Sequence, residues 1–217
     1  MWRCKFMIKY YVKKNCIPII FEIFFIISCF LVPKEYIIYT NCLFYVCLFI
    51  YYILKRDLNL KDWFFSFKSG KKYWEQVGLT LLGFMLAFGI TIALENIFPN
   101  IDTGFIGLRR NSWLSLIVFF ISTIILPAVT EETFFRKNMI LLHSKQAVAI
   151  TMTISMFLYA IEHALSWWGI LLTMIWAIPL SIAYIKTKNI YVVMTAHFIG
   201  SLLGNGFDVI FTAIQLI

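Results

Sequence analysis

Two adjacent glutamates and an arginine interrupt an otherwise strongly apolar stretch, in the run TEETFFR at residues 130–136. On a helix, Glu132 and Arg136 are four residues apart and can form an ion pair, while Glu131 points about 100° away. A free carboxylate in a low-dielectric chamber takes up a proton more readily than one in water, which suits a general base that activates water. The spacing therefore predicts Glu131 as the base and Glu132 with Arg136 as structural partners. In the alternative interpretation, both glutamates only pair with Arg136 and Lys137 at a helix end.

Two histidines lie in later apolar segments. His163 ends one apolar run, and His197 lies about two helical turns into another. Either one alone could be a packed, hydrogen-bonded residue, but two of them after a glutamate pair indicate a polar site. Imidazole and carboxylate groups can bind a divalent metal such as zinc, with Glu131, His163 and His197 as the ligands here, or they can polarise water and hold an oxyanion without a metal. The residues leave both options open.

Other catalytic patterns have less support in this sequence. Ser166, Ser181 and Ser201 lack the Gly-x-Ser-x-Gly surroundings of a nucleophilic elbow. The sequence contains no His-Glu-x-x-His motif and no glycine-rich phosphate loop. The chemistry that remains is water activation by carboxylate and imidazole groups.

The composition places these residues in a membrane. Of the 217 residues, 61% are hydrophobic and 14% are charged, which is far from the usage of soluble domains. Apolar runs long enough to cross a bilayer recur along the chain. We therefore predict an all-α fold, a polytopic transmembrane helical bundle of seven or eight spans, in which residues 207–217 form the uncertain eighth. The seven predicted spans are 17–32, 36–54, 74–98, 113–129, 147–165, 167–185 and 190–203.

The basic residues predict the orientation of the bundle. All of the 19 Lys and Arg residues except Lys34, Arg109 and Arg110 fall before the first span or in alternate connections after it. Positive charge concentrates on the cytoplasmic side, so the N-terminus is predicted to be cytoplasmic. The net charge of +8 is thus explained by topology, and we expect no nucleic-acid partner. The predicted location is the membrane of a bacterial cell, with lipid as a partner.

The segment 55–72 mixes large apolar side chains with six basic residues. That composition is typical of a helix lying in the cytoplasmic interface, although it could also form a docking surface. We predict two parts of the chain: N-terminal transmembrane helices over 1–112, which include this segment, and a catalytic helical core over 113–217.

Three motifs resemble those of the CPBP family of intramembrane proteases, also called the Abi or CAAX-protease family, which includes bacteriocin-immunity proteins. The first, Glu-Glu-x-x-x-Arg, is complete in residues 131–136. The second, Phe-x-x-x-His, is similar to the segment from Tyr159 to His163. The third, His-x-x-x-Asn or Asp, differs here because Ser201 follows His197 by four residues, and Asn205 stands one turn later. The resemblance covers roughly residues 113–205.

The resemblance implies a role for each matching residue. Glu131 and His163 would activate the water, and His197 with the residue at Ser201 would hold the oxyanion or complete the polar site. Asn205 could take the place of the missing asparagine. Glu132, Arg136 and Tyr159 would be structural or orienting residues.

The expected function is that of an intramembrane endopeptidase acting on a membrane-associated, lipid-modified, bacteriocin or signalling peptide. The serine at position 201 favours an alternative, a catalytically impaired member that acts as a bacteriocin-immunity or sensor-kinase-binding scaffold. A transporter or channel is a third option, since buried Glu and His also mark proton routes.

Straight spans would place Glu131 near the cytoplasmic membrane face and His163 near the opposite one, since about 27 Å of helix separates Lys145 from His163. For a shared site, we expect the fourth helix to continue past Glu131 and the three helices with Glu131, His163 and His197 to enclose a polar chamber.

Overall fold

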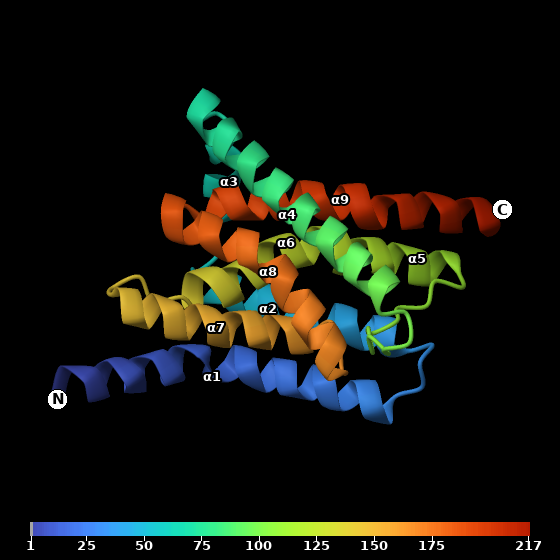
Figure 1. The fold of residues 1–217 in the computed structure, drawn as a ribbon, viewed down its shortest axis with the longest axis horizontal. Coiled ribbons are helices and arrows are strands. Elements are labelled where there is room, and N and C mark those ends of the chain that lie inside the picture. The colour runs from blue at the N-terminus through green and yellow to red at the C-terminus, as the bar shows by residue number, and fades with distance from the viewer. Residues whose placement is uncertain (1) are drawn as a thin grey trace.

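The computed structural model describes the backbone of residues 2–217 and the side chains of residues 11–217. The described chain is a bundle of helices, confirming the all-α prediction (Figure 1). The elements, in chain order, are α1 (Trp2–Leu31), α2 (Ile37–Leu54), α3 (Leu60–Ser66), α4 (Lys71–Ile97), α5 (Trp113–Phe120), the π-helix η1 (Ile121–Ile125), α6 (Leu126–Glu131), the π-helix η2 (Glu132–Asn138), α7 (Lys145–Ile161), α8 (Trp167–Thr187) and α9 (Ile190–Gln215).

Six stretches in the described part of the chain are long and apolar enough to cross a membrane, and α7 is a shorter apolar helix of 17 residues. Together they give the predicted polytopic bundle. Residues 207–217 do not form a separate eighth element, because α9 continues without a break to Gln215. The chain is therefore an integral membrane protein, built from helices that satisfy their own backbone hydrogen bonds in lipid.

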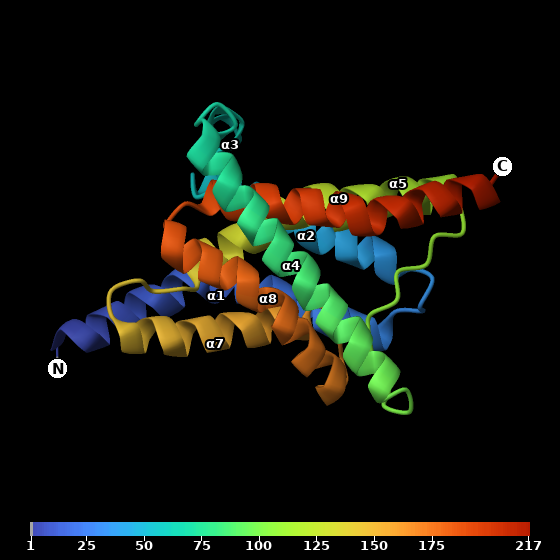
Figure 2. The same cartoon turned by 45° about the horizontal axis from the view of Figure 1, so that its top comes forward.

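The helices adopt two main directions. In Figures 1 and 2, α1, α2, α7 and α9 run roughly along the long axis, while α4 and α8 cross them obliquely. α4 packs against both α8 and α9, and α8 packs against α7. The C-terminus and the loop between α4 and α5 lie at one end of the bundle, and α3 lies toward the other.

The predicted interfacial segment contains a short helix, α3, which packs against the N-terminal part of α9. The Asn59 side chain caps α3 by accepting from the backbone N–H of Lys61. Trp63 is buried and its indole N–H donates to the Thr195 hydroxyl at 2.8 Å. Phe64 is exposed on the other side of α3. The amphipathic segment is thus tied to the helix that carries His197.

The fourth predicted span continues to Asn138, well past Glu131, as expected for a shared site. Pro127 has no backbone N–H and cannot donate to the carbonyl of Thr123 four residues earlier. That carbonyl accepts a bond from the Asn205 side chain at 3.1 Å, and the carbonyl of Ser122 accepts one from Asn41 at 3.5 Å. The π-helical turn η1 precedes the proline and η2 follows Glu131, so the helix changes pitch on both sides of the glutamate pair. Such π segments often occur at functional sites.

Candidate active site

Glu132 lies between a cation and an imidazole in the centre of the bundle. Its Oε2 atom lies 3.3 Å from Nε of Arg136, and its Oε1 atom lies 2.7 Å from Nδ1 of His197. The side chains of Glu132 and Arg136 are completely buried. The Arg136 guanidinium also lies over the Tyr159 ring, 4.6 Å from its centroid. The predicted ion pair is present, and it connects the glutamate motif to the histidine of α9.

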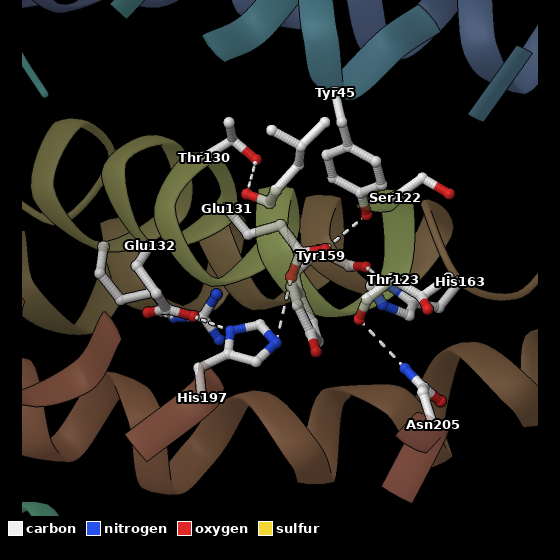
Figure 3. Close-up of polar contacts among 12 residues, drawn as sticks. Tyr45, Ser122, Thr123, Thr130, Glu131, Glu132, Tyr159, His163, His197 and Asn205 are labelled. Atoms are coloured by element: carbon white, nitrogen blue, oxygen red, sulfur yellow. Dashed lines mark hydrogen bonds and ion pairs between the residues drawn. The ribbon is translucent and has the colours of Figure 1, made fainter. Parts of the chain in front are cut away.

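Glu131 points away from this ion pair, as the helical angle predicts. Its Oε1 atom accepts a bond from the Tyr45 hydroxyl of α2 at 2.5 Å. Its Oε2 atom has no hydrogen-bond partner among the described residues and lies 4.0 Å from Nε2 of His197 (Figure 3). Tyr45 thus fixes one oxygen of the carboxylate and leaves the other free for a ligand.

Glu132 fixes the orientation of the His197 ring. If Nδ1–H donates to the Glu132 carboxylate, the neutral ring presents a lone pair on Nε2 toward Glu131, and the protonated ring presents an N–H there. Phe84 packs edge-on against the ring, with centroids 5.6 Å apart. Phe84 fits because residue 200 is glycine, since a Cβ atom there would lie 2.7 Å from a Phe84 ring carbon.

A cavity of about 590 Å³ brings the predicted catalytic residues together. Its lining includes all four of them, Glu131, His163, His197 and Ser201, together with Tyr159 and Asn205. Glu132 and Arg136 are not among the lining residues. They act through His197, which lines the cavity and is in contact with Glu132. The predicted chamber therefore exists, and α2, α4 and α5 contribute to its walls as well.

His163 reaches this cavity from the turn between α7 and α8. Its Nδ1 atom lies 2.8 Å from the Tyr159 carbonyl, and its ring packs on the Tyr159 ring with centroids 4.5 Å apart. Its own carbonyl accepts from the backbone N–H of Ile106, next to the isolated bridge between Phe105 and Ala164. The loop before α5 folds back along this turn, with Gly104 at a positive φ of 57°, where a Cβ atom would also meet Ser166. This loop holds His163 at the cavity that Glu131 also lines.

Tyr45 and Glu162 are two of the lining residues that were not predicted as site residues. Tyr45 is one of 11 tyrosines, and no motif in the sequence distinguishes it. Glu162 is only 4% exposed, lines the cavity, and has no hydrogen-bond partner for either carboxylate oxygen among the described residues. The sequence marks Glu162 as an ionisable residue in an apolar segment, which is a signal for a functional position, but it gives no spacing that assigns a role.

A comparison with protein families agrees with the motifs. Residues 113–203 match the family model of the type II CAAX prenyl endopeptidase, Rce1-like. The match confirms the resemblance drawn from the three motifs for this part of the chain and supports a peptidase of the CAAX-protease type. No curated protein and no solved structure matches the chain.

The Rce1-like segment runs from α5 into α9, so it contains Glu131, His163, His197 and Ser201. Tyr45 and Asn205 lie outside it. The donor to Glu131 and the donor to the Thr123 carbonyl therefore come from parts of the chain that the family model does not cover.

The donor atoms near Glu131 fit a divalent metal. Glu131, Glu132 and His197 each offer a ligand atom, and these atoms lie within 4.8 Å of one another. Tetrahedral coordination with bonds of about 2.0 Å would place two ligand atoms about 3.3 Å apart, so Nε2 of His197 and Oε2 of Glu131, now 4.0 Å apart, would have to move closer to hold a metal. The bond from His197 Nδ1 to Glu132 is the carboxylate contact that usually orients a metal-binding histidine. His163, the third predicted ligand, lines the same cavity but is not part of this close group.

Proposed function

We propose that the protein hydrolyses a peptide bond within the membrane, with Glu131 as the base that activates water. The observation that carries this proposal is the free Oε2 atom of Glu131, which faces His197 inside a cavity while its other oxygen is held by Tyr45. A water bound at Oε2 would lose a proton to Glu131 as its oxygen attacks the carbonyl carbon. The same proton would then pass to the leaving amine as the C–N bond breaks.

His197 would stabilise the negative charge that develops on the carbonyl oxygen. The Glu132 carboxylate holds the ring at Nδ1, so Nε2 is directed toward the cavity and would donate to the oxyanion when it carries a proton. Ser201 lies one turn further along α9 on the cavity wall and supplies a second donor. His163, held by the Tyr159 carbonyl, would position the water from the opposite side.

A bound divalent metal would polarise the attacking water and the carbonyl oxygen. Glu131 and His197 would hold it, with Glu132 orienting the histidine through Nδ1. Treatment with a chelator, followed by addition of zinc, decides between the two forms of the mechanism. Activity that is lost and then restored indicates the metal form, and activity that a chelator does not change indicates the metal-free form.

The proposed substrate is a membrane-associated or lipid-modified peptide. The cavity lies inside a bundle whose outer helices expose many large apolar side chains, such as Phe24, Leu79 and Leu82. Its lining combines aromatic and aliphatic side chains, such as Phe88, Ile92 and Trp176, with polar and charged ones. A peptide held close to the bilayer reaches such a site more readily than one in water.

The decisive experiment compares Glu131→Gln with wild type on a library of fluorogenic peptides in proteoliposomes. The amide keeps the shape of the side chain but cannot take a proton, so we expect a loss of at least about 100-fold in kcat, the usual contribution of a general base. Glu95→Gln is the matched control, because Glu95 lies on α4 and does not line the cavity. Equal activity of wild type and Glu131→Gln would refute the assignment.

Ser201 supports a second candidate, a scaffold that binds a bacteriocin or a sensor kinase through the same chamber without cleaving it. Serine is shorter than the asparagine of the motif, and the Asn205 amide donates to the Thr123 carbonyl. If the protein acts as such a scaffold, the Glu131→Gln variant should keep the biological effect of the wild type in cells.

A further inference from the structure

The cavity continues beyond the catalytic residues along one face of α9. His197, Ser201, Asn205 and Asp208 follow one another at intervals of four, four and three residues, and all four line it. At 1.5 Å per residue, the distance from His197 to Asp208 along the helix is about 16 Å. The cavity is thus an elongated groove, with the glutamates at one end and Asp208 with its partner Arg110 at the other.

The charged groups are divided between the two ends of this groove. Glu131 and Glu162 are at the inner end and are 1% and 4% exposed. Arg110 and Asp208 are at the outer end, with side chains 26% and 52% exposed. Among the described residues that line the groove, Arg110 is the one Lys or Arg side chain. An anionic group would therefore be repelled from the inner end and attracted to Arg110.

Two contacts hold the Arg110 guanidinium in place, and one of them, the ion pair with Asp208, can be exchanged for a contact with another carboxylate. Its guanidinium stacks on the Phe119 ring, 4.4 Å from the centroid, and one nitrogen lies 3.3 Å from the Asp208 carboxylate. A half-exposed ion pair of this kind adds little stability, so another carboxylate can replace Asp208 at low cost. Stacking fixes the guanidinium plane and leaves its edge free for a two-point contact with an incoming carboxylate.

We propose that Arg110 binds a carboxylate of the peptide substrate, four or five residues away from the bond that is cleaved. This inference rests on the proposed peptidase function. The spacing follows from the 16 Å between the two ends, because an extended chain spans about 3.3–3.6 Å per residue. The carboxylate can be the C-terminal α-carboxylate or an acidic side chain, since both have the same chemistry.

The test measures KM and kcat for a peptide series with a single carboxylate at different distances from the cleaved bond. One arm carries a free C-terminal acid and the other a C-terminal amide with one aspartate, which separates the two sources. We expect KM to be lowest at four or five residues, and Arg110→Gln to raise it about three- to tenfold with kcat nearly unchanged. Arg110→Lys should keep part of the effect, and Asp208→Asn should lower KM.

Arg109→Gln is the matched control, because Arg109 is the neighbouring exposed arginine and does not line the groove. Equal KM values for Arg109→Gln and Arg110→Gln, or a KM independent of the position of the carboxylate, would overturn the proposal.

A binding measurement separates this inference from the peptidase proposal. The Glu131→Gln variant is titrated with the fluorescent form of the same peptides and anisotropy is recorded, so that no cleavage is required. Binding that depends on both Arg110 and the carboxylate supports the anion site even if wild type cleaves no peptide. Binding that depends on neither overturns the anion site even if the peptidase is active.

Discussion

Replacement of Arg136 by methionine would leave the Glu132 carboxylate without its cationic partner in the centre of the bundle. Both side chains are completely buried and their charged atoms are 3.3 Å apart. Removal of one member of a buried pair usually costs about 3–5 kcal/mol, because the remaining charge has no water to solvate it. Glu132 keeps His197 at 2.7 Å, so the lower end of that range, about 3 kcal/mol, is expected.

The assay is thermal unfolding of the purified protein in one detergent, followed by tryptophan fluorescence. At about 2–4 °C per kcal/mol for a chain of this length, Arg136→Met should lower the midpoint by roughly 6–12 °C. The double variant Glu132→Gln with Arg136→Met should recover much of this loss, because it removes the unpaired charge as well as its partner.

The chain offers an internal control with the same spacing. Lys71 and Glu75 also form an ion pair across one helical turn, at 3.7 Å, but their side chains are 91% and 58% exposed. Lys71→Met should hardly move the midpoint, since exposed pairs contribute little. If Arg136→Met and Lys71→Met shift the midpoint equally, burial does not make the loss of one partner more destabilising than it is in an exposed pair.

Three further outcomes are expected. Tyr45→Phe removes the donor to Glu131 at nearly constant volume, and should lower kcat about tenfold or more; it should also lower the thermal midpoint, because a buried carboxylate oxygen that loses its donor costs about 1–3 kcal/mol, and an unchanged kcat would contradict the role of the hydroxyl. Asn205→Leu leaves a helix carbonyl without its donor and should cost about 1–3 kcal/mol, visible as a lower midpoint. For orientation, a cysteine at Arg109 should react with an impermeant maleimide from outside the cell and one at Lys145 should not, in a background without native cysteines; the opposite pattern would reverse the predicted topology.

The local part of the site could be predicted from the sequence because it depends on helix geometry alone. Glu132 and Arg136 are four residues apart on one helix, so their ion pair needs no knowledge of the tertiary fold. The opposite direction of Glu131 follows from the same geometry. The prediction that the helix continues past these residues also holds, because their charges are paired inside the bundle and do not need to reach a membrane surface.

The contacts between helices could not be predicted in the same way. Tyr45 contacts Glu131 only because α2 packs beside α6. Nothing in the apolar sequence of α2 indicates that the turn with Tyr45 is the one that faces the glutamate. The pairing of His197 with Glu132, 65 residues apart, depends equally on how α9 crosses the helix of the glutamates. For His163, a prediction based on straight helices places it far from Glu131. In the structure, the turn after α7 places His163 in the same elongated cavity as Glu131.

The N-terminal helices contribute to the candidate site, although the family match covers residues 113–203 only. The Oε1 atom of Glu131 is bound by Tyr45 of α2, and the carbonyl of Ser122 is bound by Asn41, one turn earlier on the same helix. α2 therefore supports both the base and the distorted turn before Pro127. Without α2, Glu131 would lose the donor that fixes one of its oxygens, and the carbonyl would be left unpaired in an apolar environment, which is costly. A segment limited to the matched residues thus lacks two of the contacts that hold the proposed base in position.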